Sequence, residues 1–257
     1  YNAVEQFVSK KIGTFTEDIS TRPAYFGPSA FIDFIHSLQL DISGADISFT
    51  APLSFDAEIK KGDIHVSDMF NLYKYENMLY VMTLSGREIK DVLEASYYMW
   101  TNQMKSPNDH LLWFKKKRRE GAEDRASFQN FSFNFDSASG IIYTVDVTKP
   151  QGEKITITSM ADGSPFRMDK IYKVALNSYR GNGGGELLTK GSGIPQEDLK
   201  GRIIFSTDKD LRFYLMNYIE KKGTMDPKAL NQWKFVPEKW TVPAAQRDSE
   251  YLFRSVQ

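Results

Sequence analysis

The chain has 257 residues, with 33 basic and 33 acidic side chains and hence a formal net charge of zero; 41% of its residues are hydrophobic and 14% are aromatic. The balanced charge gives no electrostatic argument for binding nucleic acid or an anionic membrane. The absence of cysteine excludes disulfides, thiolate metal sites and cysteine nucleophiles. No apolar run approaches the ~18 residues that a membrane span requires.

Two helices are predicted near the N-terminus from the spacing of apolar residues. The first runs from Val4 to Ile12, and Gly13 is expected to end it. The second follows Gly27-Pro28. Its apolar residues fall at positions i, i+3, i+4 and i+7, which predicts one buried face: Phe31, Phe34, Ile35 and Leu38.

The middle of the chain alternates between strands and helices. Short apolar runs predict strands at Ile47–Leu53 and Met78–Leu84. Ser85 and Glu88 have capping-box spacing, so a helix is expected to begin there. Residues 101–127 are polar and without periodicity, and they are predicted to form a long mobile insertion.

The C-terminal half contains four further predicted strands. Ile141–Val147 and Lys154–Ser159 are expected to pair antiparallel, and two more strands are predicted at Ile171–Leu176 and 202–205. A capped helix is predicted from Thr207 to Gly223. The Pro- and Trp-containing tail, 227–257, is expected to form an irregular strap. The chain shows no internal repeat, and its fold class is predicted to be mixed α/β (α+β) in a single domain.

Self-evident catalytic machinery is absent from the sequence. The three histidines, His36, His65 and His110, lie far apart along the chain, which argues against a histidine metal cluster. There is no Gly-x-Ser-x-Gly nucleophile motif. The basic run 115–119 is followed directly by acidic residues and is interpreted as a solvated loop.

Two loops at predicted strand ends carry the candidate binding chemistry. The segment 72–77 precedes the Met78 strand, and the segment 177–186 (Asn-Ser-Tyr-Arg-Gly-Asn-Gly-Gly-Gly-Glu) follows the Ile171 strand. The glycine loop lacks the Gly-Lys-Ser/Thr of a phosphate-binding P-loop and the spacing of a dinucleotide fingerprint, so alone it indicates only a tight turn. Each loop also has a tyrosine beside amide side chains, and two such rings can hold a nucleobase by stacking.

With these two loops, the sequence resembles the C-terminal domain of the 5′-nucleotidase family. Within this family, the sequence resembles most the branch of 2′,3′-cyclic-nucleotide 2′-phosphodiesterases/3′-nucleotidases. The segments that carry this resemblance occur in family order over roughly residues 1–220: 44–46, 61–64, 72–77, 84–88, 133–136, 143–150 and 177–184. The chain departs from the family in two places: the segments 26–33 and 52–59 lack arginine, and Gly185 replaces an aspartate.

The resemblance implies a site in this chain. The nucleoside would lie between two aromatic rings, Tyr75 and Tyr179, with Asn77 contacting the base. The remaining substrate-binding residues would come from the glycine loop: Arg180, Asn182, Gly183 and Gly184. No catalytic residue and no metal ligand are expected in this chain.

The resemblance also implies a larger protein. Residues 1–13 would end an interdomain helix, and 14–257 would form the substrate-binding domain with layered helices and mixed sheets. Two divalent metal ions and the hydrolytic chemistry would belong to a metallophosphoesterase domain preceding this one in the same polypeptide. The enzyme would be periplasmic, secreted or on the cell surface. Two alternatives remain: a non-catalytic module that binds another flat ligand or a surface partner, and a freestanding enzyme.

Overall fold

A computed structural model describes residues 2–116 and 126–254 of the chain. Its central feature is a mixed five-stranded sheet in which only one pair of strands, β10 and β3, is parallel. In spatial order the strands are β11 (Ile203–Asp210), β6 (Met78–Ser85), β10 (Ile171–Asn177), β3 (Ile47–Thr50) and β7 (Ser137–Ser139).

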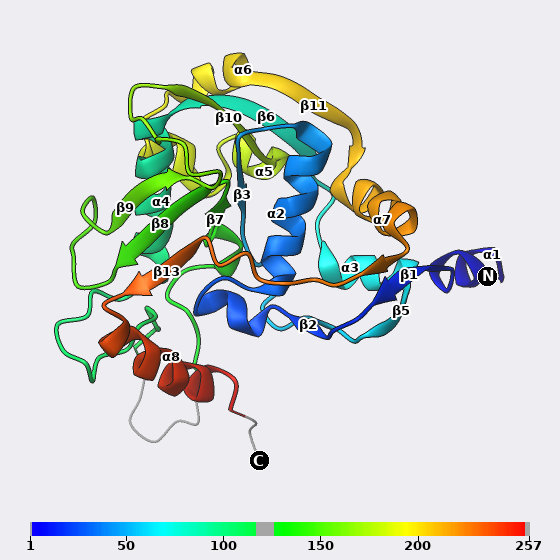
Figure 1. Cartoon of the computed structure of the whole chain (residues 1–257), viewed down its shortest axis with the longest axis horizontal. Helices are drawn as coiled ribbons and strands as arrows, with labels where there is room; N and C mark the ends of the chain where they lie inside the picture. The colour runs from blue at the N-terminus through cyan, green and yellow to red at the C-terminus, as the bar shows by residue number, and fades with distance from the viewer. Residues whose placement is uncertain (1, 117–125, 255–257) are drawn as a thin grey trace.

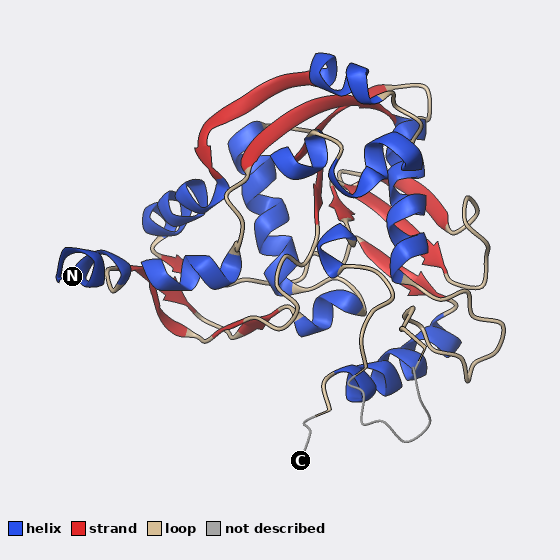
Figure 2. Cartoon of the chain, turned by 180° about the vertical axis from the view of Figure 1, so that it is seen from behind, coloured by secondary structure: helices blue, strands red, loops and turns tan. Residues whose placement is uncertain are grey.

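Helices cover both faces of this sheet. Successive residues of a strand point to opposite faces. On β10, Val174 belongs to the apolar cluster that contains residues of α4 (Gly86–Trp100), whereas its neighbour Ala175 packs with residues of α2 (Ala30–Ser43). The sheet therefore separates two apolar cores. Figure 1 shows α2 in the middle of the molecule, and the view from behind in Figure 2 shows further helices over the strands.

Local signals in the sequence set the two long helices. Ser85 accepts a hydrogen bond from the Glu88 amide (3.1 Å) and Glu88 accepts one from the Ser85 amide (2.8 Å), which confirms the predicted capping box. The helix α2 begins after Ser29, whose hydroxyl accepts from the Ile32 amide, and ends at Gly44 in the left-handed conformation. Both predicted helices are confirmed.

A second sheet lies beside the first and includes a strand of the C-terminal tail. In it, β8 (Ile141–Asp146) pairs antiparallel with β9 (Ile155–Met160), as predicted, and parallel with β13 (Trp233–Val236). The prediction of an irregular strap is wrong, because α8 (Glu238–Leu252) follows β13. Pro237 only precedes this helix, and Thr241, Ala244, Asp248 and Leu252 give it a buried face despite the proline at 243. Figure 1 shows α8 below the sheets.

The predicted first helix is too long. The helix α1 ends at Val8, and Ile12 and Gly13 belong to β1 (Lys11–Phe15). Gly13 does not stop a helix; a Cβ atom there would lie 2.6 Å from the Ile219 side chain and 2.7 Å from the Gly223 carbonyl, so close packing demands glycine. In Figure 1, α1 projects from the side opposite β8 and β9.

The predicted start of the last sequence-derived helix is also wrong. Thr207 lies in β11, where its hydroxyl accepts from the Leu79 amide (3.0 Å). The helix α7 (Leu211–Lys222) begins later, after Asp210 caps the Phe213 amide at 3.0 Å, and it ends before Gly223 as expected. Threonine is common both as a helix cap and in strands, so its identity alone does not separate the two roles.

The described part of the predicted mobile insertion is packed. Met104, Leu111 and Leu112 are buried, and Thr101 forms an isolated bridge with Leu112. The buried Asp248 of α8 accepts the Leu112 amide (2.9 Å) and pairs with His110 (2.5 Å). The sequence gives no sign of the two contacts with Asp248, because α8 lies far along the chain. Residues 117–125, which include part of the basic run, lie outside the described residues.

Short elements complete the domain. The chain also forms the sheet β12-β1-β5 and the pair β2-β4. The remaining bounds are β2 (Ile19–Ser20), β4 (Glu58–Ile59), β5 (Gly62–His65), β12 (Thr224–Met225), α1 (Asn2–Val8), α3 (Met69–Leu72), α5 (Ser178–Gly181) and α6 (Leu199–Arg202). None of the helices formed by the described residues is long and apolar enough to cross a membrane.

Candidate functional site

Strand pairing brings the two predicted loops together. The strands β6 and β10 are antiparallel, and Leu79 lies opposite Asn177, so the start of one strand meets the end of the other. The Ser178 hydroxyl accepts a hydrogen bond from the Met78 amide (3.0 Å) at this edge. Tyr75 precedes β6 and Tyr179 follows β10, so both tyrosines lie at the same end of this strand pair.

A third aromatic side chain connects the two tyrosines. The ring centroid of Phe133 lies 6.5 Å from that of Tyr75 and 6.1 Å from that of Tyr179, with interplanar angles of 74° and 80°. The Tyr75 and Tyr179 residues are 39% and 40% exposed. Two rings from distant parts of the sequence thus share one neighbour and remain open to solvent. Offset or edge contacts of this kind are favourable for aromatic pairs.

The glycine loop shapes the surface around Tyr179. A Cβ atom at position 184 would lie 2.5 Å from Cε2 of Tyr179 and 2.5 Å from its carbonyl oxygen, so only glycine allows the loop to lie against the ring. Gly183 and Gly185 both have positive φ angles, 96° and 68°. The side chain of Asn134 fills the space that a side chain at 185 would need, which explains the glycine at this family departure.

Arg180 is buried beneath this surface. Its guanidinium makes a two-point ion pair with Asp136 (2.8 and 2.9 Å) and donates to the Asn134 side chain (3.2 Å) and to the Phe133 (3.1 Å) and Gly184 carbonyls. The residue is 2% exposed. The resemblance implies a substrate contact for Arg180, and in the structure its guanidinium bonds within the protein, where it joins the glycine loop to the 133–136 segment.

The other predicted contacts lie around the tyrosines. Asn182 is exposed, and its carbonyl accepts from Gln196 (3.0 Å). Asn77 is half-buried, and its backbone carbonyl accepts from the Leu211 amide (2.8 Å). Its side chain lies near the hydroxyl of Tyr73, a fully buried residue whose pKa is raised by desolvation. The loops therefore bring all the predicted residues to one region, with Arg180 underneath.

Two of the three histidines pair with polar side chains of the fold. His36 is fully buried between the hydroxyl groups of Ser48 (2.9 Å) and Ser137 (3.2 Å), and burial lowers its pKa to about 3. His110 pairs with Asp248. Within 2–116 and 126–254, no group of three or more histidine, aspartate or glutamate residues is arranged to hold a metal ion.

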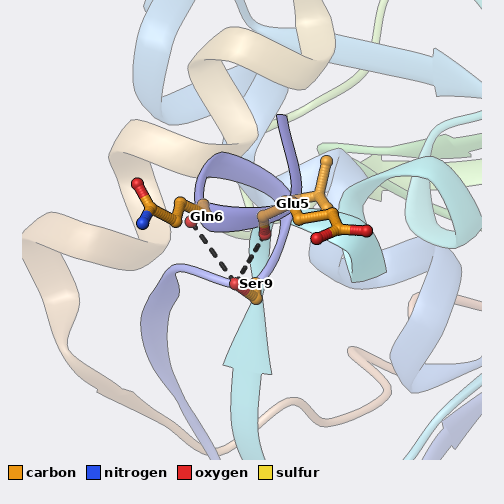
Figure 3. A pocket seen from close by; sticks show the side chains of 4 residues that line it. Glu5, Gln6 and Ser9 are labelled. Atoms are coloured by element: carbon orange, nitrogen blue, oxygen red, sulfur yellow. Dashed lines mark hydrogen bonds between the residues drawn. The ribbon is translucent and has the colours of Figure 1, made fainter. Parts of the chain in front are cut away.

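A surface hollow lies elsewhere, on α1. It has a volume of about 480 Å³ and is lined by Glu5, Gln6, Val8 and Ser9. Figure 3 shows that its hydrogen bonds are local, since the Ser9 hydroxyl donates to the Glu5 and Gln6 carbonyls. A single short segment lines this hollow, so it has no facing wall that could hold a flat ligand.

Two residues of the site were missed from the sequence. Phe133 and Asn134 belong to the segment 133–136, whose letters resemble the family but do not by themselves indicate a role. They precede β7, the outermost strand on the side of β3, and nothing in their sequence spacing links them to Tyr179. The four adjacent letters Phe-Asn-Phe-Asp were the available signal, because two aromatic residues flank an amide.

The chain is similar in sequence to known nucleotide phosphoesterases. The chain is 30% identical over 196 residues to the trifunctional nucleotide phosphoesterase protein YfkN of Bacillus subtilis, covering 72% of this chain and 12% of that protein. It is 25% identical to the 2′,3′-cyclic-nucleotide 2′-phosphodiesterase/3′-nucleotidase of Haemophilus influenzae, covering 92% of this chain and 38% of that protein. The chain thus spans only a minor part of these relatives.

Solved structures share the fold. The crystal structure of a 5′-nucleotidase precursor from Thermus thermophilus aligns with a TM-score of 0.67 at 19% identity, over 92% of this chain and 41% of that one. The sequence model of the 5′-nucleotidase C-terminal domain family matches residues 11–190. The chain belongs to the 5′-nucleotidase C-terminal domain family.

Proposed function

We propose that this domain binds the nucleoside part of a nucleotide, with the base stacked between Tyr75 and Tyr179. The observation that carries the proposal is the shared contact of both half-exposed rings with Phe133, although the tyrosines come from distant parts of the sequence. Stacking of a base on an aromatic ring contributes about 1–3 kcal/mol and tolerates every base, because each has a π-face.

Polar groups around the rings would orient the nucleoside. Asn77 and Asn182 supply amide side chains, and the tight turn at Gly183 and Gly184 allows a ligand to approach the backbone. Arg180 acts as a positioning residue, since its ion pair with Asp136 fixes the loop on which Tyr179 stands. A charged group held in this way keeps the stacking surface preorganised.

In the whole protein, this domain would deliver the substrate to a second domain. We propose a periplasmic or secreted phosphoric ester hydrolase, in which a metallophosphoesterase domain of the same polypeptide holds two divalent metal ions. The names of the relatives and the small share of their length that this chain covers support this arrangement. The metal ions would activate water there, while stacking here would hold the phosphate in reach. The present chain alone would bind nucleosides without hydrolysing nucleotides.

Calorimetric titration of the purified chain with adenosine tests the proposal. Replacing both Tyr75 and Tyr179 with alanine removes two stacking contributions, so we expect binding to weaken roughly 30-fold or more. Tyr98→Ala is the matched control, because Tyr98 is 44% exposed and packs against Trp113 instead. Equal affinities of the wild type and the double variant would refute the stacking site. Binding of sugars in preference to nucleosides would favour the alternative, a non-catalytic module.

A further inference from the structure

The amide side chain of Asn134 has one end fixed by the protein. Its Oδ1 atom lies 3.2 Å from Nη1 of Arg180 and 3.4 Å from the hydroxyl of Tyr179. Arginine only donates hydrogen bonds, so the atom that faces it must be the amide oxygen. This contact removes the usual ambiguity between the two ends of an asparagine amide.

The other end of the amide is available. Among the residues that the structure describes, the Nδ2 group of Asn134 has no hydrogen-bond acceptor. The residue is half-buried and lies at the hydroxyl end of Tyr179, a residue that is 40% exposed. A ligand stacked on the Tyr179 ring would therefore bring its edge beside two N–H donors with a fixed direction.

Asn134 is held more firmly than an ordinary surface amide. Arg180, which orients it, is 2% exposed and pairs with Asp136. Ser96 donates to the carbonyl of Asp136 (2.7 Å), which anchors the same segment to α4. A donor that is already oriented loses little conformational entropy on binding, so its hydrogen bond contributes to selectivity.

We propose that Asn134 is a specificity-determining residue of the nucleoside site, and that its Nδ2 group donates a hydrogen bond to an acceptor atom of the bound nucleoside. The inference rests on the function proposed above. The acceptor is a ring nitrogen of the base or an oxygen of the ribose, and both present a lone pair at the edge of a stacked nucleoside. Asn134 touches the ligand, and Arg180 acts through Asn134.

Calorimetry with acceptor-deleted nucleosides tests this inference. The ligands are adenosine, its 1-, 3- and 7-deaza analogues and its 2′- and 3′-deoxy analogues. With the wild type, we expect one analogue to bind about 3- to 10-fold more weakly than adenosine because of the lost hydrogen bond. Loss with a deaza analogue would place the contact on the base, and loss with a deoxy analogue would place it on the ribose.

The variant Asn134→Asp then assigns the contact. The substitution keeps the oxygen that faces Arg180 and removes the donor, and uncharged ligands avoid phosphate repulsion. We expect the variant to bind adenosine more weakly and to no longer distinguish the sensitive analogue. Asn134→Ala supplies a second route if the aspartate disturbs folding, and Asn217→Asp on the exposed side of α7 is the control for the charge change.

The outcomes separate the inference from the function on which it rests. If the wild type binds adenosine but every analogue binds equally well, or if the variants keep the full discrimination, Asn134 makes no such contact and the stacking site still stands. If the wild type binds no nucleoside at all, both proposals are overturned. Discrimination present in the wild type and absent in the variants supports the assignment.

Discussion

Gly184 offers a sharp test of how the loop controls the binding surface. An alanine Cβ at this position would lie 2.5 Å from both Cε2 and the carbonyl oxygen of Tyr179. Ordinary contacts begin near 3.4 Å, so the ring or the loop must move by about 1 Å. Ring rotation alone cannot relieve the contact with the carbonyl oxygen. The Gly184→Ala substitution is therefore expected to displace Tyr179 from its place beside Phe133.

The expected loss of affinity follows from the stacking contribution. Displacing one ring forfeits up to about 1–3 kcal/mol, which corresponds to a roughly 5- to 150-fold weaker binding of adenosine. The φ angle at 184 is not in the left-handed region, so the alanine adds a steric contact without a backbone penalty. Overpacking costs about 1–3 kcal/mol of stability in addition, and this quantity is measured separately by urea denaturation.

The assay compares calorimetric titrations of the wild type, Gly184→Ala and Gly27→Ala. Gly27 is the matched control because a Cβ atom there meets no other atom within 4 Å. We expect the control to bind adenosine as the wild type does. If Gly184→Ala folds and binds adenosine with unchanged affinity, the position of the Tyr179 ring does not depend on this glycine, and the reasoning fails.

Three other predictions concern buried charged or titratable groups. Burial raises the pKa of Asp33 to about 6, so the folded chain keeps a proton that the unfolded chain releases near 3.8, and the wild type loses stability as pH rises through this range. Relative to the wild type, the free energy of unfolding of Asp33→Asn should increase by about 3 kcal/mol between pH 4 and 7.5, as measured by urea denaturation. A stability difference between the two proteins that does not change with pH would contradict this prediction. Burial lowers the pKa of His36 to about 3, so the wild type should lose stability as pH falls below 6.5, by up to ~1.4 kcal/mol per pH unit. The substitution His36→Gln should remove this pH-dependent contribution. Parallel plots of unfolding free energy against pH for the two proteins would rule the prediction out. Arg180→Met leaves Asp136 buried without its partner and should cost about 3–5 kcal/mol of unfolding free energy, whereas a cost below ~1 kcal/mol would show that the ion pair does not organise the site.

The sequence predicted those elements whose signals are local. The capping box at Ser85 and Glu88 and the apolar face of α2 depend on residues within a few positions of one another, and β8 and β9 follow each other directly along the chain; the structure confirms all three. The failures involve contacts between distant segments. Gly13 resembles a helix stop, but it is a glycine because Ile219 packs against it.

The same distinction applies to the site. The nearness of Tyr75 and Tyr179 could be predicted because each lies in a recognisable loop and the resemblance to the family pairs the two loops. The buried ion pair of Arg180 could not be predicted, since an arginine beside a glycine loop is equally suited to bind an anion or a buried carboxylate. Asp136, its partner, lies 44 residues away. Phe133 and Asn134 were missed because only the folded chain brings their segment against Tyr179.

The crystal structure of this chain with adenosine tests the central claim most directly. We predict that the base lies between the rings of Tyr75 and Tyr179, about 3.5 Å from each and close to parallel with both. An adenine bound anywhere else on the domain, or tyrosine rings that contact the ribose alone, would contradict the stacking site.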